Sequence, residues 1–399
     1  MQSNVTPVVY SKQLKTKTSI IVSAILIILL VGSVYISQLI FQEISKSFNI
    51  DILEARNVFS LACCFYAISF FIYGPLSDRI ATRLLVLFGC IGTVFCLGIS
   101  GIISSFNLFL FIMSLLGFFA AAVPAALFAY TARNTPNEKL PQTMGVMISA
   151  SIIGIIFSRS MIAMLTDYWS WQVAFMIYAC LIICACFFIP FAIKKTKKTS
   201  KFSISRTYID AAKLLLNHSV IIFLIIGFIL FFVYLGLSSI LTFHLKSAPF
   251  YLSSTTLGWL NFVGLSATIG ATLTGKLSQF MCKERLLIIC LLCVIAPVIM
   301  IGFSSELLYL ILGIFCLFLV VFGIQPILIA MLNQIVTIHS RGAISSLYLL
   351  FCLAGGSLGT YTLGILYENW NWISVIITCI VLTFFNAFLA WLGIQRIKK

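Results

Sequence analysis

The chain has 399 residues, of which 61% are hydrophobic and 9% are charged, and its formal net charge is +15. A soluble domain of this length cannot bury so much apolar surface, so the composition excludes a soluble globular protein and predicts residence in the lipid bilayer. The basic residues are spaced between apolar stretches and do not gather on one solvated face. This spacing excludes a nucleic-acid partner and indicates topology signals instead.

Twelve apolar stretches are each long enough to cross a bilayer as a helix, which takes about 20 residues. The longest polar break separates six of these stretches from the other six. The sequence therefore predicts an all-α membrane protein of two pseudo-symmetric six-helix bundles, with an N-terminal bundle at 1–193, a basic cytoplasmic linker at 194–216 and a C-terminal bundle at 217–399. In chain order the predicted helices are residues 18–41, 53–77, 83–104, 107–132, 141–166, 172–193, 217–245, 254–279, 285–303, 306–334, 342–367 and 372–395.

The distribution of lysine and arginine predicts the orientation. With the N-terminus inside, 21 of the 25 basic residues fall on the cytoplasmic side, and only Lys46, Arg56 and Lys246 fall outside. Arg159 is left within the membrane. This bias places both termini in the cytoplasm, and it explains the net charge by attraction to the membrane surface.

A repeat at an offset of 201 residues relates the two halves. Chains built from two related halves of membrane helices are typical of transporters whose binding site lies between the halves. The matching positions are Gly74, Leu76 and Ser77 with Gly275, Leu277 and Ser278; Gly154 with Gly355; and Trp169 and Trp171 with Trp370 and Trp372.

Three polar residues of the first half are candidate substrate contacts. Tyr35 and Gln38 lie three apart in the first helix, so we expect them to share one helical face in the outer half of the membrane. Arg159, in the fifth helix, lies at a similar depth. A charge inside the bilayer costs about 2.5–3.5 kcal/mol on the insertion scale, so a cavity, a partner or a ligand must compensate it. Arg159 therefore either contacts an anionic substrate or a gating partner, or it bonds to backbone carbonyls or extends towards the membrane surface.

The second half offers Tyr234 in its first helix, Gln325 beside Pro326, and Tyr348 in the eleventh helix. Each is a candidate substrate contact, and each could equally form a hydrogen bond between packed helices. Small residues also recur at helical spacing in the fifth and eleventh helices, where we expect them to let the two halves pack closely as they move. They are Gly145, Ser149, Gly154, Ser158, Gly355, Gly359 and Gly364.

The loop after the second helix carries the most specific motif. Residues 74–83 read GPLSDRIATR, and Asp78 can accept hydrogen bonds from a helix N-terminus and from an arginine. The stretch resembles the G-x-L-x-D-R-x-G-R-[KR] signature of the major facilitator superfamily, with Ala81 and Thr82 as departures. The weaker second copy, at 275–285, has no acid at the position equivalent to Asp78.

The resemblance implies a major facilitator fold and a loop that clamps the halves on the cytoplasmic side. It implies gating roles for Gly74, Asp78, Arg79, Arg83 and Arg133. The Tyr-x-x-Gln of the first helix, the glycine-rich fifth helix with its arginine, and the tryptophan corners after helices 5 and 11 resemble the bacterial efflux-type branch. In this superfamily helices 1, 4, 7 and 10 line the cavity.

No carboxylate lies at mid-membrane in the predicted helices. The ionisable groups nearest to a transport path are Glu43, Asp167 and His244, all near the outer ends. An arginine that relatives carry early in helix 4 is missing from residues 113–117. If protons drive transport, coupling could run through these outer groups or through a protonatable substrate.

The sequence predicts a secondary transporter and not an enzyme, because no phosphate-binding loop and no catalytic constellation is visible. The 13 cysteines lie almost entirely in apolar stretches, so we expect no disulfide framework, no metal and no cofactor. By resemblance the activity is proton-coupled export of a small organic compound from the inner membrane of a bacterium, by a monomer. Because Arg159 has no buried acid beside it, we expect an anionic or zwitterionic compound.

Two alternatives remain open. The first is uptake or exchange of an organic anion, such as a polycarboxylate or a siderophore, which the missing arginine and missing acid favour. The second is a membrane sensor that has a transporter fold and does not transport; such a protein would be expected to lose its polar cavity groups or to gain a soluble domain.

Overall fold

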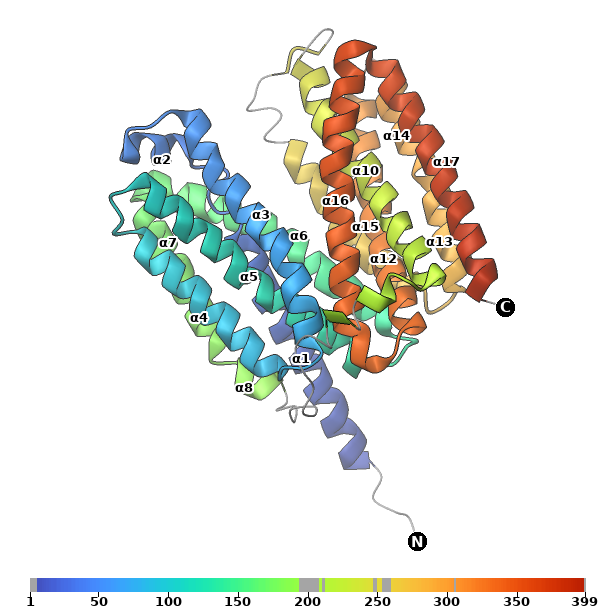
Figure 1. Cartoon of the computed structure of the whole chain (residues 1–399), viewed down its shortest axis with the longest axis horizontal. Helices are drawn as coiled ribbons and strands as arrows, with labels where there is room; N and C mark the ends of the chain where they lie inside the picture. Colours follow the sequence, from blue (N-terminus) through green and yellow to red (C-terminus); the bar gives the residue numbers. More distant parts are fainter. Residues whose placement is uncertain are drawn as a thin grey trace. The chain divides into compact units, whose positions relative to one another are not determined.

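The computed structural model describes residues 6–193, 208–209, 212–246, 250–252, 260–304 and 306–397, and within these ranges the chain forms helices and turns without a strand (Figure 1). The predicted linker, 194–216, lies mostly outside the described residues. The all-α prediction is confirmed. The helices are α1 (Thr6–Ser33), α2 (Phe41–Phe48), α3 (Ile52–Ser77), α4 (Thr82–Ser100), α5 (Phe106–Asn134), α6 (Leu140–Tyr168), α7 (Trp171–Cys186), α8 (Ile189–Ala192), α10 (His218–Lys246), η1 (Asn261–Leu265), α12 (Ser266–Leu277), α13 (Lys283–Cys293), α14 (Ile295–Phe303), α15 (Leu307–Ile335), η2 (Ile338–Ser340), α16 (Arg341–Asn369) and α17 (Trp372–Ile397).

Ten helices among the described residues are long and apolar enough to cross a membrane. A shorter apolar helix at Thr18–Ser33 and the α12 segment occupy the other two predicted spans. Large apolar side chains on these helices remain exposed, including Ile91 at 65% and Phe111 at 58%. In water such a surface would be unfavourable, whereas lipid tails solvate it. The chain is thus a multi-pass membrane protein.

The chain packs as two compact units, of which the first holds residues 1–131 and 150–202 and the second holds residues 132–149 and 203–399. In the first unit α4 packs on α7, and α1 packs on α7 and α8. In the second unit α10 packs on α16 and α17, and α12 packs on α15 (Figure 1). The end of α5 and the beginning of α6 therefore belong to the second unit, although by sequence they lie in the first repeat.

Small residues bring helices together inside each unit. A Cβ atom on Gly154 would lie 2.3 Å from the Ile28 carbonyl oxygen of α1, and one on Gly355 would lie 2.1 Å from the Phe228 carbonyl oxygen of α10. The expectation that these two glycines pack the two halves against each other was therefore wrong. Gly154 and Gly355 instead let a helix approach a neighbour in its own unit, at equivalent places of the repeat. Gly145 differs, because it packs α6 against Ala271 of α12 within the second unit.

The first helix ends earlier than predicted. The helix α1 stops at Ser33, and residues 34–39 form turns in which Tyr35 N–H donates to Gly32 and Gln38 N–H donates to Tyr35. Both hydrogen bonds join residues three apart, as in a 3₁₀ helix, in which the side chains at i and i+3 eclipse. Tyr35 and Gln38 therefore share a side of the chain through these turns and not through an α-helical face.

Candidate functional site

Arg159 and Gln38 form the central polar contact of the first unit. The Arg159 Nη1 donates to the Gln38 Oε1 at 3.0 Å, and its Nε donates to the Ile155 carbonyl oxygen at 3.2 Å. Both side chains are half-buried. A guanidinium has five N–H donors, and these two bonds use two of them. The arginine is thus anchored by two of its N–H groups, and its other donors remain available to an anion.

Close packing of α1 against α6 sets the position of Gln38. A Cβ on Gly32 would come within 1.8 Å of Ser158 Oγ, so only glycine fits there. The Ser158 and Tyr178 hydroxyls are 2.6 Å apart, and the Tyr178 hydroxyl donates to the Leu29 carbonyl oxygen at 2.7 Å. This buried network fixes the last turn of α1, and the turns that follow carry Tyr35 and Gln38 towards Arg159, the residue that follows Ser158 on α6.

Tyr35 lies at the edge of this cluster. Its ring packs on Phe59 of α3 with centroids 5.4 Å apart, and the charge of Arg159 acts on it. Tyr66, also on α3, interacts electrostatically with Tyr35 and Cys63. Sequence reasoning missed Tyr66, although a tyrosine inside an apolar span was a signal. The structure therefore brings together all three predicted contacts of the first half and adds a fourth polar side chain.

The predicted contacts of the second half take up packing positions. The Tyr234 ring meets Phe318 and Phe322 edge to face, with centroids 5.0 and 5.3 Å apart. Gln325 is buried in the middle of α15. Tyr348 is fully buried, with its ring so close to Gly227 of α10 that a Cβ there would lie 2.6 Å from it. These three side chains are spread through the helix contacts of the second unit.

The loop at residues 74–83 is a compact turn between α3 and α4. The Ser77 hydroxyl donates to the Gly74 carbonyl oxygen at 2.7 Å, and the Asp78 N–H donates to Pro75 at 3.3 Å. Asp78 is buried, with 8% of its surface exposed, and Arg79 and Arg83 are half-buried. This carboxylate lies four residues before the buried Thr82 that begins α4, which suits an acceptor at a helix N-terminus.

A second set of polar contacts holds the α5–α6 connection to the helices of the second repeat. Arg341, the first residue of α16, donates to the Ala132 carbonyl oxygen and, at 3.0 Å, to Asn137 Oδ1. Lys283 Nζ donates to the Asn137 carbonyl oxygen at 2.9 Å. Gln279 Nε2 donates to Gln142 Oε1. Arg133, a predicted gating residue, is half-buried in the last turn of α5 beside these contacts in sequence.

Sequence reasoning missed Arg341, Asn137 and Gln142. One signal existed, since Gln279 is the residue that the 201-residue offset pairs with Asp78. The absence of an acid there left the second copy without an evident function. The structure shows a neutral amide pair at that position, and a Cβ on Gly275 would lie 3.0 Å from the Gln142 Cα.

A family model matches most of the chain. The model of the Major Facilitator Superfamily matches residues 22–360. An uncharacterized transporter of Buchnera aphidicola subsp. Schizaphis graminum is 26% identical over 364 residues, which cover 89% of this chain and 86% of the relative. The multidrug resistance protein MdtG of Escherichia coli is 27% identical over 243 residues, covering 59% of this chain and 58% of that protein.

Solved structures agree with the fold. The human organic anion transporter MFSD10 superposes with a TM-score of 0.75 at 16% identity, covering 94% of this chain and 99% of that one. The fucose:proton symporter FucP of E. coli superposes with a TM-score of 0.73 at 12% identity, covering 94% and 98%. At these identities the similarity establishes the fold alone.

Proposed function

Since the chain belongs to the Major Facilitator Superfamily and is a multi-pass membrane transporter of small molecules, we propose that it exports an anionic or zwitterionic organic compound in exchange for protons. The observation that carries the proposal is the anchored, half-buried Arg159, which lies at membrane depth with donors to spare. The similarity to MdtG, a multidrug resistance protein, supports the proposed direction.

The proposed anion contact consists of Arg159, Gln38 and Tyr35. Gln38 orients the guanidinium by accepting one of its N–H groups, and Ile155 fixes its Nε. A carboxylate or phosphate would then receive hydrogen bonds from the remaining N–H groups of the guanidinium. We assign Tyr348 to packing, and we place Tyr234 and Gln325 in the proposal as secondary positions in the second unit.

The proposed gate has two parts. In the first unit it includes Gly74, Asp78, Arg79 and Arg83, which form or flank the turn between α3 and α4. In the second unit it includes Arg133 and the contacts of Arg341, Lys283 and Gln279 to residues 132–142. These contacts lie at the end of the helices that the charge bias predicts to be cytoplasmic. Because α5 and α6 continue into the first unit, releasing the contacts would allow the conformational change that opens this end during the transport cycle.

Ligand-induced thermal stabilisation tests the proposed substrate class, because any ligand of the folded state raises the unfolding midpoint. The purified protein is heated with anionic, zwitterionic and cationic compounds, for the wild type, Arg159→Ala and Arg56→Ala. Arg56 is an exposed arginine of the same unit and serves as the matched control. We expect carboxylates or phosphates to stabilise the wild type and Arg56→Ala but not Arg159→Ala. Stabilisation by cationic compounds that survives in Arg159→Ala would contradict the proposal.

The direction, the coupling ion and the topology need their own tests. We propose a monomer in a bacterial inner membrane with both termini in the cytoplasm, on the basis of the lysine and arginine distribution. Inverted and right-side-out membrane vesicles, with the compound that stabilises the protein added outside them, distinguish export from uptake. Accumulation in inverted vesicles with an acidic lumen, and so an outward-directed proton gradient, is the expected result, and accumulation only in right-side-out vesicles would favour the uptake of an organic anion.

A further inference from the structure

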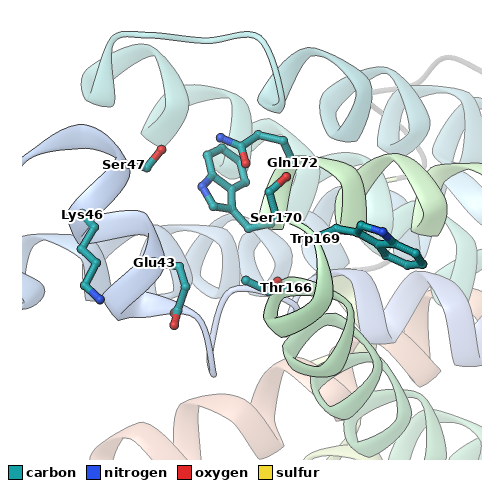
Figure 2. Close-up of a pocket in the computed structure, with 8 residues that line it drawn as sticks. Glu43, Lys46, Ser47, Thr166, Trp169, Ser170 and Gln172 are labelled. Atoms are coloured by element: carbon teal, nitrogen blue, oxygen red, sulfur yellow. The ribbon is translucent and has the colours of Figure 1, made fainter.

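A groove of about 370 Å³ lies at one end of the first unit, where α6 ends about two turns after Arg159. It is bounded by α2, by the last turn of α6 and by the first turn of α7 (Figure 2). Glu43 and Lys46 of α2 extend in the same direction, and Thr166 of α6 lies beside Glu43 (Figure 2). The two ends of α6 and α7 belong to consecutive membrane-length spans, so the groove lies at a boundary between membrane and water.

Among the residues that line this groove, three have a polar atom that is buried below the surface and has no hydrogen-bond partner in the described part of the chain. These atoms are Glu43 Oε2, Thr166 Oγ1 and Trp171 Nε1. The Trp171 side chain is only 4% exposed and packs on Phe109 and Phe175, so its N–H cannot turn away to water. Buried polar groups are almost always hydrogen-bonded in folded proteins. Three orphaned atoms around one groove therefore indicate a missing ligand.

The second repeat provides an internal control for this argument. The 201-residue offset pairs Glu43 with His244, Thr166 with Tyr367 and Trp171 with Trp372. In the second unit the His244 ring stacks on Trp372 at 4.2 Å, and the Tyr367 ring meets both of them edge to face.

The indole N–H is also satisfied in the second unit. Trp372 Nε1 donates to the Gly302 carbonyl oxygen at 3.0 Å. Gly302 is paired by the offset with Gly101, yet Trp171 makes no such bond in the first unit. The same three positions are thus closed by stacked rings in one repeat and left as an open polar groove in the other.

The charges of the groove define its ligand. The Glu43 carboxylate and the Thr166 hydroxyl can accept hydrogen bonds from an ammonium group. The Lys46 ammonium and the Trp171 N–H can donate to an anionic oxygen. Glu43 and Lys46 are three residues apart on α2, so both charges project from one face of that helix. A zwitterion with a primary amine close to an acidic group matches this arrangement.

At a membrane boundary, the zwitterion that fits this description is a lipid head group, in which the amine is joined to a phosphate. Trp169 and Tyr168 beside the groove are 65% and 77% exposed, which is typical of aromatic side chains at the level of lipid head groups. We propose that the groove binds an ethanolamine phosphate, with its ammonium on Glu43 and Thr166 and its phosphate on Lys46 and Trp171. The phosphoethanolamine can be the head group of a phospholipid or a free molecule.

Thermal unfolding of the full-length protein tests this binding. The detergent-solubilised protein is titrated with short-chain phosphatidylethanolamine, with phosphatidylcholine and phosphatidylglycerol of the same chain length, and with free phosphoethanolamine. We expect the midpoint to rise with phosphatidylethanolamine only among the three lipids. A rise with free phosphoethanolamine as well identifies the head group as sufficient, and a rise with the lipid alone shows that the acyl chains contribute. Equal responses to all three lipids, or no response to either ethanolamine compound, would overturn the proposal.

Single substitutions in the groove test whether the ethanolamine compound raises the unfolding midpoint by binding there. Trp171→Phe removes the unpartnered N–H while keeping an aromatic ring, and Glu43→Gln removes the charge that would hold the ammonium. Each should require at least tenfold more ethanolamine compound for the same rise, with little change in the midpoint measured without ligand. Trp372→Phe is the control: it loses the bond to Gly302, so its midpoint without ligand should fall while the response to ligand persists. An undiminished response in both Trp171→Phe and Glu43→Gln would place the binding elsewhere.

Discussion

At the residue scale, Arg159 combines two arrangements that sequence reasoning treated as alternatives. It donates to a backbone carbonyl oxygen one turn earlier on α6, and it also donates to Gln38. The backbone bond satisfies the Nε, which reduces the cost of keeping the charge at membrane depth. The remaining donors are what a ligand could use. A single arginine can thus be structurally anchored and still bind an anion.

A double-mutant cycle measures the Arg159–Gln38 contact. We compare unfolding free energies of the wild type, Arg159→Ala, Gln38→Ala and the double variant. We expect a coupling energy of about 1.5 kcal/mol, at the lower end for a hydrogen bond to a charged group because both side chains are half-buried. A coupling energy of zero would show that the 3.0 Å contact contributes nothing and would remove Gln38 from the site.

Gly32 allows a second residue-scale prediction. A methyl group there would meet Ser158 Oγ and the Gly154 carbonyl oxygen, so Gly32→Ala should force α1 away from α6. We expect a loss of about 1–3 kcal/mol in unfolding free energy, together with weaker binding of the anionic ligand. Gly98→Ala is the control, since nothing lies within 4 Å of a Cβ at that position. Equal effects of the two substitutions would contradict the packing described for Gly32.

Sequence patterns identified Arg159, Gln38 and Tyr35, missed Tyr66 despite its place in an apolar span, and could not identify Arg341. The first three stood out because polar residues in apolar spans are costly and few. Arg341 lies at a helix end, where a basic residue costs little and carries no signal. Its bonds to Ala132 and Asn137 join segments about 200 residues apart, and only the folded chain brings these together.

At the element scale, the turn between α3 and α4 should control the rate of the conformational change. Asp78→Asn keeps the shape of the side chain but removes its charge, so the buried turn would lose its charged acceptor. We expect turnover to slow about tenfold, equivalent to about 1.4 kcal/mol, with ligand affinity nearly unchanged. Transport rates and binding constants separate these effects, and Glu54→Gln, at an exposed acid on α3, serves as the control. Loss of affinity at an unchanged rate would argue against a gating role.

The α5–α6 connection is the second such element. Arg341→Gln should remove the bonds to Ala132 and Asn137, which hold residues 132–142 on the second unit. We therefore expect faster hydrogen exchange of the backbone amides in this segment, measured by mass spectrometry. Arg285→Gln removes an exposed arginine on the neighbouring α13 and should leave the exchange unchanged. Unchanged exchange in Arg341→Gln would show that other contacts secure the segment.

The element boundaries show what hydropathy alone cannot predict. The predicted first span ran to residue 41, whereas α1 stops at Ser33. Residues 34–39 instead form turns with hydrogen bonds between residues three apart. An apolar composition is compatible with either conformation. Polar signals did place other ends well, as at the loop that separates α3 from α4. Tyr35 and Gln38 lie where the regular helix stops, so hydropathy did not predict their local geometry.

At the scale of the whole molecule, the two repeats keep the same scaffold and differ in chemistry. Gly154 and Gly355 serve the same close approach in their respective units. Yet the position of Arg159 is Thr360 in the second repeat, and the ring cluster of His244 and Trp372 has no counterpart beside Trp171. The repeat predicted the scaffold because packing is symmetric. The functional differences lie at the positions where the two halves no longer match.

The central claim is that a compound held by Arg159 crosses the membrane in exchange for protons. Proteoliposomes that contain a pH-sensitive dye test it most directly, with an imposed pH gradient and the compound that stabilises the wild type. We expect the compound to trigger proton flux with the wild type and with Arg56→Ala, and we expect Arg159→Ala to abolish this flux. Transport of the compound by the wild type without any proton flux would contradict the coupling, and undiminished transport by Arg159→Ala would contradict the site.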